Sequence, residues 1–184
     1  MSLTCCQIDW ACTHYLPPNC TFLGVLPSNY MPTKKDITKF GKHPIAFIIN
    51  TDPSNMPGSH WLAFYSPFGE HSRLECFDSF GEPASNYGLV DNVAFNSISV
   101  NTTQFQANNT ASCGFFCIFY ILHRATRQRS ISSILNVMHH VQPSKVDNYV
   151  KSFVKVYWPF PTTPEAHCNE CCNQCSKSRN ELFK

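Results

Sequence analysis

The most regular apolar pattern lies in the middle of the chain. Residues 44–50, PIAFIIN, form a nearly continuous apolar run that ends in Asn-Thr-Asp-Pro, which predicts a buried strand. Further strands are predicted at HWLAFYS (60–66), RLECFDSF (73–80) and SISVNTTQFQ (97–106), with turn-forming residues between them. Leu74 and Cys76 alternate onto one face of the third strand, and Asp78 follows in the same register.

Helical patterns lie on both sides of these strands. Residues 113–127, 130–140 and 144–157 are predicted helices, and Ser144 with Asp147 resembles a capping box for the last one. Before the strands we expect a short helix or coil and an extended stretch at TFLGVL (21–26). Strands grouped between helices predict an α+β fold, with one domain over residues 1–160 and a flexible cysteine-rich tail over 161–184.

The composition fits one globular domain. The chain has 184 residues, 43% hydrophobic and 14% aromatic, which is enough for a sizeable core. A net charge of +2 gives little support to nucleic-acid binding, and no segment approaches the ~20 apolar residues that cross a membrane. The N-terminus also lacks the pattern of a signal peptide. Eleven cysteines, an odd number gathered mostly near the two ends, predict free thiols in an intracellular, reducing compartment.

Cys113 stands at the predicted start of a helix and is followed by Gly114. The positive end of a helix favours a thiolate, which is the reactive form of cysteine. Gly114 would leave room for a substrate carbonyl to approach the backbone. Cys117, one turn further on, lies among aromatic and aliphatic residues and is expected to be core packing.

His60 and Asp78 could assist such a thiol. His60 begins a strand, where its ring could lie at the edge of a cleft, and Trp61 beside it would line that cleft or pack in the core. Asp78 ends an apolar strand, where a buried carboxylate needs a donor such as an imidazole. Glu75, expected on the solvent face, and Glu70, expected in a turn, are the rival acids.

Gln106 precedes Cys113 by seven residues, and its amide could stabilise an oxyanion. Gln104 would share the same strand face, so side-chain chemistry leaves the choice between the two open. An imidazole, a carboxylate, a helix-capping thiol and an amide together follow the logic of a cysteine hydrolase.

Two blocks that contain these residues resemble one family. GSHWLAFYSPFGEHSRLECFDSFGE and TTQFQANNTASCGFFCIFYILHRA are similar to the adenovirus maturation protease (adenain), and the likeness runs from about Thr21 to Ala125. The shorter length favours the related proteases of Maverick/Polinton transposons and other adenovirus-like elements.

The resemblance implies a papain-like cysteine protease fold of the adenain and SUMO-protease type. Such a fold has a central mixed sheet with helices around it and the nucleophile at the N-terminus of a buried helix. The family motifs match His60 as base, Asp78 as acid, Gln106 as oxyanion donor and Cys113 as nucleophile. The implied activity is cleavage of viral or virus-like capsid and core precursors after small residues, in the host nucleus or the virion, without a membrane or a required cofactor.

Two departures concern partners. Adenain is activated by a peptide disulfide-linked to a cysteine between the acid and the glutamine, but residues 77–112 contain no cysteine. Adenain is also activated by DNA, and a net charge of +2 gives little support for strong DNA binding here. Two alternatives stay open. SUMO- and ubiquitin-like-specific proteases share the same order of motifs, and a non-catalytic binding module could use the same fold.

The tail offers the one candidate metal site in the sequence. His167 precedes two Cys-x2-Cys pairs, formed by Cys168, Cys171, Cys172 and Cys175. This spacing is typical of zinc ligands, although the pairs lie closer together than in most zinc sites. Disordered thiols, adventitious disulfides and lipidation are the alternatives.

Overall fold

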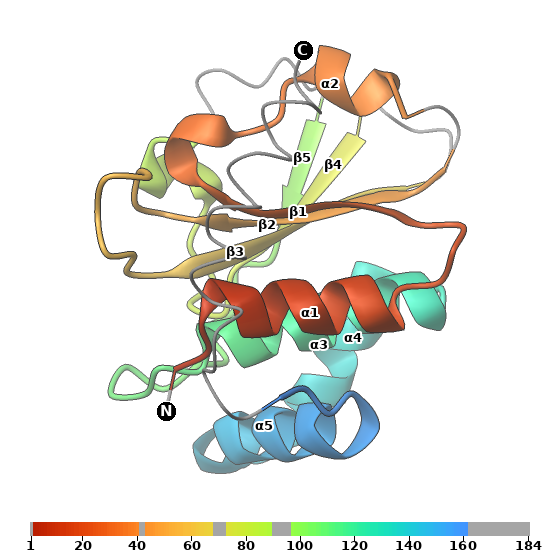
Figure 1. Cartoon of the computed structure of the whole chain (residues 1–184). Coiled ribbons are helices and arrows are strands. Elements are labelled where there is room, and N and C mark those ends of the chain that lie inside the picture. Colours follow the sequence, from red (N-terminus) through yellow and green to blue (C-terminus); the bar gives the residue numbers. More distant parts are fainter. Residues whose placement is uncertain (1, 41–42, 68–72, 90–96, 162–184) are drawn as a thin grey trace.

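The computed structural model describes residues 2–40, 43–67, 73–89 and 97–161, and it has a five-stranded sheet with helices around it (Figure 1). The strands are β1 (Thr21–Pro27), β2 (Ile45–Asn50), β3 (Trp61–Ser66), β4 (Arg73–Phe77) and β5 (Ser97–Val100), and they lie side by side in sequence order. The outer pairs β1/β2 and β4/β5 are parallel, while β2/β3 and β3/β4 are antiparallel. The predicted mixed sheet with surrounding helices is therefore confirmed.

The sheet is buried on both faces, which explains its nearly continuous apolar strands. In β2, Ala46 and Ile48 belong to the core that contacts the long helices, while Phe47 and its alternate neighbours belong to a second core on the opposite face. A strand that alternates between two apolar layers needs apolar side chains at every position. The Phe47 ring stacks on Phe64 of β3, with 5.0 Å between the ring centroids.

Two helices cover one face of the sheet. The helices α1 (Cys5–Tyr15) and α3 (Cys113–Thr126) lie there, α5 (Val146–Tyr157) packs against α3, and α4 (Ile131–His139) joins α3 to α5 (Figure 1). The short α2 (Lys34–Thr38) belongs to the opposite side. Every residue of α3 from Cys113 to His123 is buried, because the helix lies between the sheet and two other helices.

The fourth strand is shorter than predicted. β5 ends at Val100, and residues 101–106 are loop. Asn101 turns the chain there: its amide accepts from Asp78 N–H at 2.8 Å and donates to the Asp78 carbonyl at 2.6 Å. The backbone N–H groups of Phe105 and Gln106 then both donate to the Ser79 carbonyl, at 2.9 Å each. The loop is thereby held against the end of β4.

The predicted capping box of the last helix is wrong. Ser144 lies in a short 3-10 turn (Pro143–Lys145), and the N-cap of α5 is Lys145, which makes no side-chain cap. Asp147 instead points its carboxylate at donors in the loop before α3. Its hydrogen bonds thus serve this loop and not the N-terminus of α5.

Glu75 was expected on the solvent face, and this prediction is also wrong. Its face of β4 is covered by α3, so Glu75 is buried and accepts two hydrogen bonds from Arg124, at 2.7 and 2.9 Å. The Tyr120 hydroxyl donates to the same carboxylate at 2.8 Å. The alternation of side chains along β4 was predicted correctly. The covering of the Glu75 face by α3 was not predicted.

Candidate active site

Cys113 is the first residue of α3, and 8% of its surface is exposed. Ser112 is the N-cap residue, yet its side chain caps no backbone N–H of the helix. The first N–H groups of a helix have no acceptor within the helix itself. The thiol therefore lies beside backbone donors and the positive end of the helix dipole.

His60 and Asp78 meet because β3 and β4 are antiparallel neighbours. His60 immediately precedes β3 and Asp78 immediately follows β4, while Ala63 and Phe77 are paired in the register. The start of one strand thus lies beside the end of the other. His60 Nε2 is 2.6 Å from Asp78 Oδ1, and both side chains are buried. With Nε2 donating to Asp78, Nδ1 is the ring nitrogen left for Cys113.

The Asp78 carboxylate is held by several further donors. Oδ1 also accepts from Phe80 N–H at 3.0 Å, and Oδ2 accepts from Glu82 N–H and the Tyr87 hydroxyl, each at 3.0 Å. The Tyr87 ring also lies near the His60 ring, with 5.7 Å between centroids. These donors offset the desolvation free energy of the buried carboxylate, and they fix which of its oxygens faces His60.

The environment of His60 favours its protonated form. Burial by itself lowers the pKa of the imidazole, but hydrogen bonds with Asp78 and Cys113 and the charges of both groups outweigh it, and the pKa rises from 6.5 to about 9. His60 is therefore an imidazolium at neutral pH.

Gln106 is buried, and both ends of its amide have partners. Oε1 accepts from the Ser79 hydroxyl at 2.8 Å, and Nε2 donates to the Thr110 carbonyl at 2.8 Å. Gln104 is exposed, and its amide donates to the Gln106 carbonyl at 2.8 Å and to Asn108 at 2.5 Å. The two residues do not share a strand face, and Gln106 is the one that lines the cavity with Cys113.

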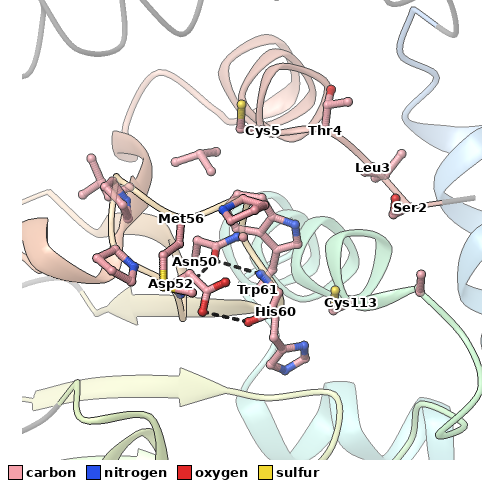
Figure 2. A pocket seen from close by; sticks show the side chains of 18 of the residues that line it. Ser2, Leu3, Thr4, Cys5, Asn50, Asp52, Met56, His60, Trp61 and Cys113 are labelled. Atoms are coloured by element: carbon pink, nitrogen blue, oxygen red, sulfur yellow. Dashed lines mark hydrogen bonds between the residues drawn. The ribbon is translucent and has the colours of Figure 1, made fainter.

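The four predicted residues border or support one cavity of about 700 Å³, and Figure 2 shows two of them, His60 and Cys113. His60, Trp61, Gln106 and Cys113 line it, and Asp78 lies behind His60. The other walls come from residues 2–5, from the end of β1, from the loop over 50–59, from Phe80, and from Thr110 and Ala111. Trp61 is half-buried and contacts both the cavity and the core, so its two predicted uses coexist.

Gly114 does not line this cavity, contrary to the prediction of room for a substrate. A Cβ at Gly114 would lie 2.9 Å from Ile8 Cδ1 and 3.1 Å from Leu3 Cβ. The glycine is needed because α1 and the segment before it approach α3 closely at this point. Gly114 contributes to the site indirectly. Because it has no side chain, the N-terminal segment that forms one wall of the cavity can lie this close to α3.

Burial raises the thiol pKa of three other cysteines. Cys117 is buried and its thiol donates to the Trp61 carbonyl at 3.3 Å, and burial raises its pKa well above the ordinary value. Burial likewise raises the pKa of Cys12, and it raises that of Cys20 to about 12. No disulfide joins the cysteines in this part of the chain.

No cluster of metal ligands occurs within the residues that the structure describes. The zinc candidates Cys168, Cys171, Cys172 and Cys175 lie outside the described residues, as do Glu70 and all but the first residue of the predicted tail. No helix of the described ranges is long and apolar enough to span a membrane.

Sequence reasoning missed the residues that hold this site together. Ser79, Tyr87, Asn101 and Asp147 bind the acid, the glutamine or the loop before Cys113. Ser79 adjoins Asp78 and could have been found as a neighbour of the predicted acid. The others are common polar residues whose partners lie 9 to 40 positions away along the chain, and no local pattern marks them.

Comparisons with known proteins give distant structural likenesses. No family model matches the chain, and no curated protein matches it. Among solved structures, the chain is similar to the central domain of the uncharacterized Lpg1148 protein from Legionella pneumophila, at 16% identity, with 80% of this chain and 96% of that one covered and a TM-score of 0.46. It is also similar to the ASFV pS273R protease, at 17% identity, with 88% and 69% covered and a TM-score of 0.46. Neither likeness assigns an activity to this chain.

Proposed function

We propose that this chain is a cysteine peptidase with Cys113 as nucleophile and His60 as acid and base. The observation that supports it best is the buried His60–Asp78 pair, with 2.6 Å between Nε2 and Oδ1, beside a thiol at a helix start. An imidazole held by a carboxylate, in the wall of a cavity that a thiol also lines, provides the groups that nucleophilic catalysis needs.

The reaction follows from these positions. The Cys113 thiolate adds to the scissile carbonyl, and the negative charge moves to the carbonyl oxygen. The Gln106 amide and the backbone N–H of Cys113 donate to this oxyanion. His60 gives its proton to the departing amine as the C–N bond breaks. It then takes a proton from water, which attacks the thioester and releases the carboxylic acid and the thiol.

The substrate that we propose is a precursor protein of a virus or virus-like element, cleaved after small residues. This finer statement rests on the resemblance of the two motif blocks to adenain-like proteases. An activating peptide or DNA is also a prediction from that resemblance, and adding either to the assay tests it.

The test is selective alkylation combined with peptide cleavage. At pH 6 we expect iodoacetamide to modify Cys113 first, because a thiolate beside imidazolium His60 reacts while ordinary thiols are protonated. His60→Ala should remove this selectivity, and Cys113→Ala should remove cleavage of a peptide that contains Gly-Gly. Cys117→Ala is the matched control, because this thiol lies on the same helix and should be dispensable for cleavage.

Two results would contradict the proposal. One is a Cys113 that stays unmodified, or one whose labelling is unchanged in His60→Ala. The other is labelling by a ubiquitin-like vinyl sulfone without inhibition by a Gly-Gly peptide aldehyde, which would indicate a ubiquitin-like-specific protease instead. A protein that cleaves neither Gly-Gly peptides nor ubiquitin-like substrates, and whose Cys113 is inert, would be a binding module.

A further inference from the structure

The loop over 107–112 connects Gln106 to Cys113, and it contains only small and polar residues. Apart from one turn, in which Thr110 N–H donates to the Ala107 carbonyl at 3.1 Å, it has no regular structure. Such a segment has many accessible conformations and orders only at an entropic cost. A contact from another element is therefore needed to place its two ends.

Asp147 on α5 supplies this contact. Its carboxylate accepts from Ala107 N–H at 2.9 Å, from the Thr110 hydroxyl at 2.6 Å and from the Ser112 hydroxyl at 2.5 Å. Only 7% of Asp147 is exposed. Hydrogen bonds to a buried carboxylate are short and strong. Losing this acceptor would leave the Ala107 N–H and the Ser112 hydroxyl without it, whereas the Thr110 hydroxyl could still donate to the Ala107 carbonyl at 3.0 Å.

Each of these donors belongs to a residue that either adjoins a residue of the proposed site or is hydrogen-bonded to one. Ala107 directly follows Gln106, and the carbonyl of Thr110 accepts from the Gln106 amide at 2.8 Å. Ser112 directly precedes Cys113, and its hydroxyl bonds to Asp147 instead of capping α3. The carboxylate thereby keeps the Ser112 hydroxyl away from the N–H groups at the helix start.

The contacts of Gln106 also orient its amide. Oε1 accepts from the Ser79 hydroxyl, so Nε2 is the end that faces Thr110. Nε2 carries two hydrogens, and the Thr110 carbonyl takes one of them. The other remains for an acceptor in the cavity, provided that Thr110 stays in place.

We propose that Asp147 is a positioning residue for the oxyanion site. Through Thr110 it holds the Gln106 amide, and through Ser112 it holds the first turn of α3, so that both donors point at one substrate oxygen. This inference rests on the proposed function and adds to it a residue from α5 that touches neither the substrate nor the reacting atoms.

The test is a double-mutant cycle with Asp147→Ala and Gln106→Ala. We expect Asp147→Ala to lower kcat about 10- to 100-fold, since a displacement of about 1 Å in a reacting group has that effect. KM and the rate of Cys113 alkylation at pH 6 should stay near the wild-type values, because the His60–Asp78 pair does not contact Asp147. In the Gln106→Ala background, the same substitution should lower kcat much less.

Two further variants serve as controls. Val150→Ala removes a buried side chain from the same helix and should reduce stability without changing kcat. Asp147→Asn keeps one carbonyl oxygen for Ala107 N–H, so its kcat should lie between those of Asp147→Ala and the wild type. This variant also provides the measurement if Asp147→Ala does not fold.

Hydrogen exchange of the Ala107 amide gives a readout that is independent of activity. It should be faster in Asp147→Ala, closer to the wild-type rate in Asp147→Asn, and unchanged in Val150→Ala. Fully additive losses of kcat in the cycle, or an unchanged exchange rate at Ala107, would overturn the positioning of the oxyanion site by Asp147. An inert Cys113 in the wild type would overturn the proposed function instead, and Ala107 exchange would still report on the loop anchor.

Discussion

At the scale of single residues, the ionisation of His60 determines when the proposed site works. Its pKa is raised from 6.5 to about 9, so the imidazolium that protonates the leaving amine is present at neutral pH and is lost as the pH rises through about 9. We therefore expect kcat/KM to be level near pH 7–8 and to fall on the alkaline side with a midpoint near 9. A pH profile of kcat/KM measures this midpoint.

Asp78→Asn provides the control for that profile. Burial lowers the pKa of His60 and the hydrogen bond and charge of Asp78 raise it, so removing the charge should shift the alkaline midpoint to lower pH. An alkaline limb that is identical in the variant would contradict the assignment of this midpoint to His60.

At the scale of elements, one ion pair joins α3 to β4. Arg124 bonds to the buried Glu75 through Nε and through Nη2, and its guanidinium lies 4.5 Å from the centroid of the Tyr65 ring. Removing one partner leaves an uncompensated buried charge, so Arg124→Ala should lower the free energy of unfolding by about 3–5 kcal/mol. Urea unfolding at pH 7 measures this loss.

The exposed Arg127 is the C-cap residue of the same helix and is the matched control. Arg127→Ala should cost less than about 1 kcal/mol, since its contact with the Phe153 ring is at the surface. Equal losses in the two variants would show that the buried pair with Glu75 has no special contribution to the packing of α3 on the sheet.

At the scale of the whole molecule, His123 makes the free energy of unfolding depend on pH. It is packed among the rings of Phe119, Phe153 and Trp158, and neither of its ring nitrogens has a partner among the described residues. Burial, and then the charges of two nearby arginines, lower its pKa from 6.5 to about 4. The unfolded chain therefore binds this proton more readily, and stability falls as the pH drops from about 6.5 towards 4.

His123→Phe removes this group while keeping an aromatic ring. Between pH 7 and pH 5, the wild type should lose about 2 kcal/mol more stability than the variant, which denaturant unfolding at the two pH values measures. His123→Leu serves the same comparison if phenylalanine overpacks the site. An equal loss in wild type and variants would show that His123 is not the group responsible.

Much of the fold could be predicted locally. The strands β2, β3 and β4 and the helix α3 carry strong apolar patterns and begin or end within a few residues of the predicted bounds. The two errors of burial and capping have one cause. Glu75 lies in a strand and Asp147 in a helix, each among apolar residues. Their hydrogen-bond partners Arg124 and Ser112 lie far away in the sequence, so the local pattern does not show them.

The sequence by itself determined which residues are available for chemistry. The contexts of Cys113 and His60 are local: a polar run before an apolar helix, and a histidine at a strand start. Asp78 could likewise be found as an acid at a strand end. What only the tertiary structure decided is how these groups meet. The antiparallel pairing of β3 and β4 sets the 2.6 Å contact of His60 with Asp78, and Asp147 reaches the loop before Cys113 from a helix that follows it. The physical reason is that hydrogen bonds between distant segments depend on the packing of whole elements, which no local pattern encodes.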